Sequence, residues 1–222
     1  MKKRWIVAGL LGLLAIAFTV ALKCVDVNPV GPALTEVGFS TTNSTIHSSI
    51  VADSNWLTVS NVTVAAVVAA GLVFAGLGFV QLFRRRSIKK VDWNLVALGI
   101  TYILMVGIYV FFEKILVLNY RPVTIDGELE ASFPSSHTLF AVTIALTVIM
   151  VLPKYIKMVP VRILLSAMLI VLAYITMNGR IAGGVHWMSD VIGGVLYGSF
   201  LASVYYCLCS LKDTKKIDKE RD

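Results

Sequence analysis

The sequence predicts an all-α, polytopic membrane protein with six transmembrane helices in a bundle and both termini in the cytoplasm. Of its 222 residues, 57% are hydrophobic and only 15% are charged, and the mean hydropathy is +0.81. Soluble globular chains are nearer a quarter charged, so this composition argues against a soluble fold. Six long apolar stretches and an uneven distribution of Lys and Arg support the same conclusion. We expect residues 1–222 to form a single integral-membrane domain.

The six apolar stretches are about as long as a membrane span requires. A hydrocarbon core of about 30 Å takes roughly 20 helical residues. Within each stretch the apolar residues come in runs and do not alternate strictly with polar ones, which favours helices over the strands of a transmembrane barrel. The expected transmembrane helices are 5–22, 57–83, 93–113, 134–152, 163–178 and 187–209.

The first stretch follows Lys2, Lys3 and Arg4, which is also how a secretory signal peptide begins. It lacks a small-x-small cleavage site, so we interpret it as a membrane anchor. The segment 23–56 that follows is rich in Ser, Thr and Asn. We expect it to be an outer loop that lies as a cap on the surface of the bundle.

Most basic residues fall on one side of a chain that crosses the membrane six times. That side holds Lys2, Lys3, Arg4, Arg84, Arg85, Arg86, Lys89, Lys90, Lys154, Lys157, Arg162, Lys212, Lys215, Lys216, Lys219 and Arg221. By the positive-inside rule this side is the cytoplasm. Membrane topology therefore accounts for the net charge of +7, and the expected partner of these charges is the bilayer, not nucleic acid.

Three polar clusters lie at the expected outer ends of different helices. In the first, Lys114 and Arg121 are seven residues apart, close to two helical turns. They would project from one face if the third helix ran on to Arg121. The second cluster, residues 133–137, is Phe-Pro-Ser-Ser-His and opens the fourth helix. The N–H groups at the start of that helix would accept an anion, and Ser135 and Ser136 lie there.

The third cluster contains Arg180, His186 and Asp190. His186 and Asp190 are four residues apart, so a helix that begins there places the carboxylate and the imidazole on one side. Each of these residues also has an ordinary structural explanation when taken alone. Lys114 would be a lysine that extends to the membrane interface, and Asp190 a carboxylate favoured at a helix start. The joint occurrence of the clusters is better explained by function. Placing an ionisable residue near membrane depth costs free energy, and such residues are usually functional.

A bundle that brought the three clusters together would form a site for an oxyanion with several negative charges. Arginine matches phosphate oxygens in a bidentate manner, and lysine adds a point charge. Phosphoryl transfer needs mainly positioning and charge stabilisation, which this set supplies without a metal. One histidine would attack phosphorus and the other would protonate the leaving oxygen. A carboxylate bonded to the attacking imidazole would fix its tautomer.

The clusters resemble the signature of the type 2 phosphatidic acid phosphatase superfamily of integral-membrane lipid phosphatases. The signature begins with a lysine, six residues and Arg-Pro, as in Lys114 to Pro122. Its second part is Pro-Ser-Gly-His, and Ser136 stands here where the family has glycine. The third is Ser-Arg, five residues, His, three residues and Asp. Residues 180–190 match it, with Gly179 in place of the serine.

The resemblance implies a role for each matching residue. His186 would be the nucleophile that forms a phosphohistidine, Asp190 would orient it, and His137 would be the general acid. The phosphoryl oxygens would be held by Lys114, Arg121, Ser135 and Arg180. Ser136, which departs from the family pattern, would either join them by replacing the hydroxyl lost at Gly179 or crowd the backbone. We expect no metal and no cofactor.

The expected activity is that of a metal-independent lipid phosphatase of the cell membrane, with its site on the extracytoplasmic side. An isoprenoid carrier diphosphate such as undecaprenyl diphosphate, and phosphatidylglycerol phosphate, are the favoured lipid phosphate substrates. Phosphatidic acid and lipid A are further candidates. A phosphotransferase that passes the phosphoryl group to another acceptor would carry the same motifs. An anion transporter would need ionisable residues through the membrane depth, and the expected helix interiors hold almost none.

Overall fold

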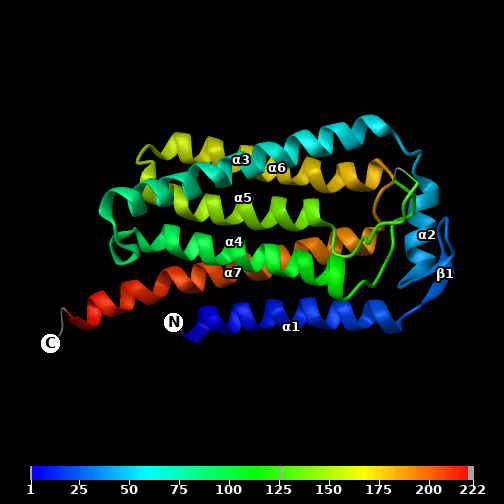
Figure 1. The fold of residues 1–222 in the computed structure, drawn as a ribbon, viewed down its shortest axis with the longest axis horizontal. Coiled ribbons are helices and arrows are strands. Elements are labelled where there is room, and N and C mark those ends of the chain that lie inside the picture. The colour runs from blue at the N-terminus through cyan, green and yellow to red at the C-terminus, as the bar shows by residue number, and fades with distance from the viewer. Residues whose placement is uncertain (1, 126, 220–222) are drawn as a thin grey trace.

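The structure, a computed structural model, describes the backbone of residues 2–125 and 127–219 and the side chains up to Leu211 (Figure 1). Within these residues six helices are long and apolar enough to cross a membrane, which confirms the predicted multi-pass fold. They are α1 (Lys2–Cys24), α3 (Ser54–Arg85), α4 (Trp93–Val110, extended by the π-helical turn η2, Phe111–Ile115), α5 (Ser136–Tyr155), α6 (Val159–Ala182) and α7 (Met188–Lys219).

Most of these helices extend a few residues beyond the predicted spans. The fifth span was expected at 163–178, whereas α6 runs from Val159 to Ala182. It begins with a proline in its first turn, a position that needs no backbone donor. It continues to Arg180 because that side chain is buried among protein groups, with only 4% of its surface exposed. Apolar composition alone therefore underestimates the length of this helix.

Helix α5 is the central element of the bundle. It lies between α3 and α6 on one side and α4 and α7 on the other (Figure 1). The contact with α7 is close because glycines face α5. A Cβ added at Gly194 would lie 2.7 Å from Cβ of Thr138, and one added at Gly198 would lie 2.9 Å from Val142. Small residues four apart allow two membrane helices to approach in this way, and the contact places the starts of α5 and α7 together.

The predicted outer loop has regular structure of its own. It contains a short antiparallel hairpin, β1 (Asn28–Val30) with β2 (Thr35–Val37), followed by the helix α2 (Ser40–Ser49). These elements cover one end of the bundle (Figure 1). Asn43 of α2 is 1% exposed and is hydrogen-bonded to Ser189 at the start of α7. The cap is thus packed into the end of the bundle and does not merely lie on its surface.

Helix α1 begins and α7 ends at the end of the bundle opposite the cap (Figure 1). The short 3-10 helix η1 (Ile88–Lys90), which joins α3 to α4, lies at that end as well. Six spans bring the chain back to the side on which it began, so the first helix begins and the last helix ends at the same end of the bundle. The starts of α5 and α7 and the ends of α4 and α6, which carry the three polar clusters, lie beneath the cap.

Candidate active site

The first turn of α7 and the residues just before it form the centre of the candidate site. Nδ1 of His186 lies 3.4 Å from Oδ2 of Asp190, and the two side chains are 2% and 0% exposed. The backbone N–H of Trp187 donates to the same Oδ2 at 2.9 Å. The spacing of four residues therefore brings imidazole and carboxylate together as predicted, although His186 precedes the helix and lies in the turn that leads into it.

Two neighbouring segments hold Asp190 in place. The amide of Asn119 donates to its Oδ1 at 3.1 Å. The backbone N–H of Ser135, at the start of α5, donates to the backbone oxygen of Asp190 at 3.0 Å. This second contact joins the predicted second and third clusters. It also means that the Ser135 N–H, which was expected to face the anion, is already bonded within the protein.

Arg121 reaches the site from an irregular loop and not from a helix. Backbone bonds between Arg121 and Glu130, and between Asn119 and Ser132, fold the segment between η2 and α5 back on itself. The guanidinium donates through Nη2 to Oε2 of Glu130 at 2.9 Å, and the side chain is only 11% exposed. The ion pair occupies Nη2 of the guanidinium and leaves its Nε and Nη1 to bind another ligand.

The structure corrects the expected arrangement of Lys114 and Arg121. The third helix ends at Ile115 in the π-helical turn, so it does not run on to Arg121, and the two residues do not share a helical face. The Lys114 side chain is 72% exposed and lies 3.6 Å from Glu113. Its role in phosphate binding stays a prediction, whereas Arg121 is joined to the buried centre.

Arg180 and His137 meet at a residue that the sequence did not single out. Oδ1 of Asn61, on α3, lies 3.2 Å from Nη1 of Arg180 and 3.1 Å from Nε2 of His137. The ends of α3, α5 and α6 are thereby joined at one oxygen. Ser136, the other serine of the second cluster, is half-buried at the start of α5.

Several buried polar atoms of the site have no hydrogen-bond partner among the described residues. They are Nε and Nη1 of Arg121, Nε of Arg180 and Nε2 of His186. Buried polar groups are nearly always paired in proteins, so such a concentration calls for an explanation. Guanidinium nitrogens can only donate, and a ligand rich in oxygen and negative charge satisfies them. This donor set therefore fits a phosphate group.

Burial, together with the positive charges of Arg121 and Arg180, lowers the pKa of His186 well below its ordinary value. The imidazole is therefore neutral at physiological pH, with a lone pair on one ring nitrogen. Since Nδ1 faces the carboxylate of Asp190, the lone pair belongs to Nε2. No group of three or more His, Cys, Asp or Glu residues suited to a metal ion occurs in the part of the chain that the structure describes.

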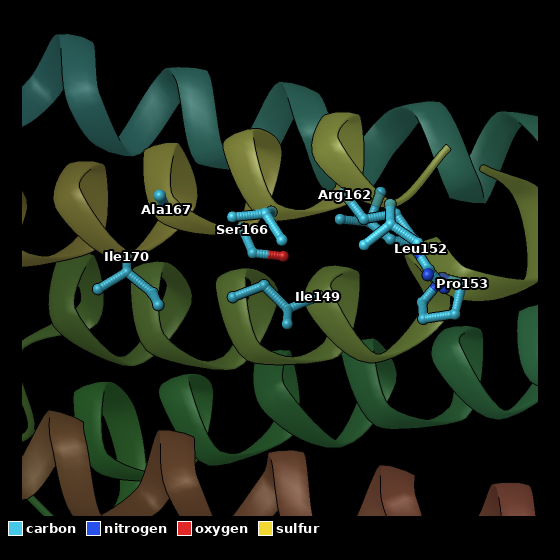
Figure 2. Close-up of a pocket in the computed structure, with 9 residues that line it drawn as sticks. Ile149, Leu152, Pro153, Arg162, Ser166, Ala167 and Ile170 are labelled. Carbon is cyan, nitrogen blue, oxygen red and sulfur yellow. The ribbon is translucent and has the colours of Figure 1, made fainter. Parts of the chain in front are cut away.

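A pocket elsewhere in the bundle does not belong to this site. It has a volume of about 490 Å³, lies between α5 and α6, and is lined largely by apolar side chains such as Ile149 and Ile170 (Figure 2). Ile149 is twelve residues beyond His137 on α5, or about 18 Å along the helix. The pocket is thus on the half of the bundle away from the polar clusters.

No sequence pattern marks the polar side chains that support the clusters. Asn61 and Asn119 contact site residues directly, and Asn43 holds the start of α7 through Ser189. Each is an uncharged residue far from its partner in the sequence, without a local pattern to mark it.

The fold and the site define a multi-pass helical membrane protein with a buried, cationic, histidine-containing centre beneath its cap. The sequence profile of the PAP2 superfamily matches residues 93–212, which include α4, α5, α6 and the described side chains of α7. The match covers more than half of the chain, and the chain belongs to this superfamily, as the resemblance predicted.

A solved structure supports the fold over almost the whole chain. It is the crystal structure of a transmembrane PAP2-type phosphatidylglycerolphosphate phosphatase from Bacillus subtilis, which is 17% identical with a TM-score of 0.59. The similarity covers 93% of this chain and 96% of that one. A comparison with curated protein sequences finds no match.

Proposed function

We propose that the protein is a lipid phosphatase that removes phosphate from a lipid phosphate monoester or diphosphate through a phosphohistidine intermediate on His186. The observation that carries this proposal is the environment of that imidazole. Nδ1 faces the carboxylate of Asp190 at 3.4 Å, and the buried Nε2 is without a partner among the described residues. A neutral, oriented imidazole with a free lone pair is what nucleophilic catalysis requires.

In the first half of the reaction, Nε2 of His186 attacks phosphorus as the bond from phosphorus to the lipid oxygen breaks. His137 gives its proton to the leaving oxygen. Asp190 stabilises the imidazolium that forms, and Arg121 and Arg180 stabilise the charge on the phosphoryl oxygens. In the second half, water attacks the phosphohistidine, His137 takes a proton from this water, and inorganic phosphate leaves.

The proposed substrate is a lipid phosphate of the outer leaflet. The site lies at the end of the bundle opposite the basic segments Arg84–Arg86 and Lys89–Lys90, which the positive-inside rule places in the cytoplasm. Because the helices are about as long as the membrane is thick, a site at this end of them would lie near the depth of the lipid headgroups. Undecaprenyl diphosphate and phosphatidylglycerol phosphate are the favoured candidates. The activity named for the Bacillus subtilis protein of similar fold supports the second.

The proposal is tested by measuring phosphate release from a panel of lipids. The protein is purified in detergent and incubated with undecaprenyl diphosphate, phosphatidylglycerol phosphate, phosphatidic acid and lipid A, with and without a chelator. We expect release from at least one lipid at the same rate in both conditions. Absence of release from every lipid contradicts the phosphatase proposal, and loss of release with chelator contradicts a metal-independent mechanism. Transfer of phosphate to an added alcohol and not to water would make the protein a phosphotransferase.

A further inference from the structure

Asn61 has an unusual position for an exposed residue of a transmembrane helix. Its Oδ1 lies within hydrogen-bond distance of two groups of the site, Nη1 of Arg180 at 3.2 Å and Nε2 of His137 at 3.1 Å. These two partners are 119 and 76 residues away in the sequence and belong to different helices. The amide therefore joins α3 to both α5 and α6 at the site.

The contact with Arg180 identifies which atom of the Asn61 amide faces the site. Guanidinium nitrogens have hydrogens to donate and cannot accept, so the atom that meets Arg180 must be the amide oxygen of Asn61. This oxygen has no hydrogen. Nε2 of His137 must then carry the hydrogen of the bond between them. The contact thus holds one ring nitrogen of His137 in its protonated form and leaves Nδ1 to exchange a proton.

The packing of α3 on α6 fixes the position of Asn61. A Cβ added at Gly179 would lie 2.9 Å from Cβ of Ser60 and 3.0 Å from the carbonyl oxygen of Trp56, so the two helices touch at this glycine. Oγ of Ser60 donates to the carbonyl of Thr176 at 3.2 Å. Gly179 is also where the superfamily signature has serine. The close approach that this glycine permits brings the next residue of α3, Asn61, to the guanidinium of Arg180.

We propose that Asn61 is a positioning residue for the general acid, which holds Nε2–H of His137 so that Nδ1 is the nitrogen that gives its proton to the leaving oxygen. The inference depends on the proposed phosphatase function. In the substrate complex His137 carries a proton on each nitrogen. The Nδ1–H bond breaks as the oxygen–hydrogen bond of the leaving alcohol forms, and the neutral ring that results keeps its hydrogen on Nε2, bonded to Asn61.

The site then contains two histidines oriented in opposite ways. Asp190 faces Nδ1 of His186 and leaves Nε2 to attack, whereas Asn61 binds Nε2 of His137 and leaves Nδ1 to donate. The two partners differ in charge, which suits their tasks. A carboxylate stabilises the cation that forms on the nucleophile, and a neutral amide orients the acid without retaining its proton.

The test compares two substrates that differ in their need for an acid. Dioctanoyl phosphatidic acid has an alcohol leaving group that must be protonated, whereas the nitrophenolate of p-nitrophenyl phosphate leaves without a proton. The measured quantity is kcat/KM, which reports the steps up to departure of the leaving group. For Asn61→Ala we expect kcat/KM to fall about tenfold more with the phosphatidic acid than with p-nitrophenyl phosphate. This effect is smaller than the rate enhancement of about 100- to 10,000-fold that a general acid supplies, because the variant keeps His137 and loses only its orientation.

Two further variants complete the experiment. Asn61→Gln retains a neutral acceptor oxygen on a side chain that is one methylene longer, and we expect the ratio of the two kcat/KM values to move back toward that of the wild type. Asn55→Ala removes another exposed asparagine of α3, and we expect no change in the ratio. Equal losses with both substrates in Asn61→Ala, or no loss, would overturn the positioning role while leaving the phosphatase intact. A wild-type protein that releases no phosphate from these two substrates or from any lipid of the panel would overturn the proposed function itself.

Discussion

Asp190 and His186 face each other at the start of the last helix, with Oδ2 of the carboxylate 3.4 Å from Nδ1 of the imidazole. Both side chains are almost completely buried. Burial makes the pair sensitive to charge, because a carboxylate in a low dielectric stabilises a neighbouring cation strongly. The pair is therefore suited to stabilise the positive charge that the proposed phosphohistidine mechanism places on His186.

Replacing the carboxylate by an amide of the same shape tests this electrostatic role. For Asp190→Asn we expect kcat for phosphate release to fall by about 100-fold or more, because the charge and the fixed tautomer are both lost. The matched control is Asp53→Asn, at an exposed carboxylate that caps α3, where asparagine caps equally well. An Asp190→Asn protein as active as this control would show that the carboxylate has no part in catalysis.

The guanidinium of Arg121 is predicted to act through its forked geometry as well as its charge. One of its nitrogens pairs with Glu130 and two others are buried without a partner among the described residues. Arg121→Lys keeps the charge but removes the planar guanidinium that can bind phosphate through two hydrogen bonds. We therefore expect kcat/KM to fall about tenfold. The comparison is Arg84→Lys, on an exposed arginine at the other end of the bundle. If both variants keep wild-type kcat/KM, charge alone is sufficient at position 121.

Gly179 is predicted to be required by helix packing. Gly179→Ser introduces the residue of the superfamily signature, yet its Cβ would lie 2.9 Å from Cβ of Ser60. Overpacking of this kind typically costs about 1–3 kcal/mol, so we expect a lower thermal unfolding temperature in detergent. Gly76→Ser on α3 is the control, because an added Cβ there meets nothing within 4 Å. Equal unfolding temperatures for the two variants would contradict the close contact between α3 and α6.

The spans could be predicted from sequence because a membrane imposes one simple demand, about 20 apolar residues in a helix. The ends of the spans follow local rules and were less predictable. Arg180 extends α6 beyond its apolar part because its charge is buried among protein groups. The cap was expected as a loop because three-residue strands such as Asn28–Val30 are too short to produce a periodic pattern.

The charged residues of the site were also predictable, because charge near membrane depth is rare and conspicuous. The arrangement of Lys114 and Arg121 was not, since it depends on the helix ending in a π-helical turn at Ile115, and no proline or glycine marks that end. The supporting amides of Asn61 and Asn119 carry no sequence signal. Their partners lie at least 70 residues away, and only the packing of the bundle brings them together.

The orientation of the protein in the membrane is open to a test on its natural cysteines. Cys24 is exposed at the capped end of α1, whereas Cys207 is buried in α7. If the capped end is extracytoplasmic, a membrane-impermeant maleimide will label Cys24 in intact cells, and Cys24→Ser will abolish the label. Labelling of Cys24 only after the cells are permeabilised would reverse the topology and place the site in the cytoplasm.

The most direct measurement of the proposed mechanism is capture of the phosphorylated enzyme. The purified protein is mixed with a lipid phosphate labelled with ³²P, quenched in alkali within one turnover, and digested for mass spectrometry. We predict a phosphohistidine, stable in alkali and labile in acid, at His186 in the wild-type protein and its absence in His186→Ala, which should also release no phosphate. Phosphate on another residue, or turnover by His186→Ala, would contradict the account.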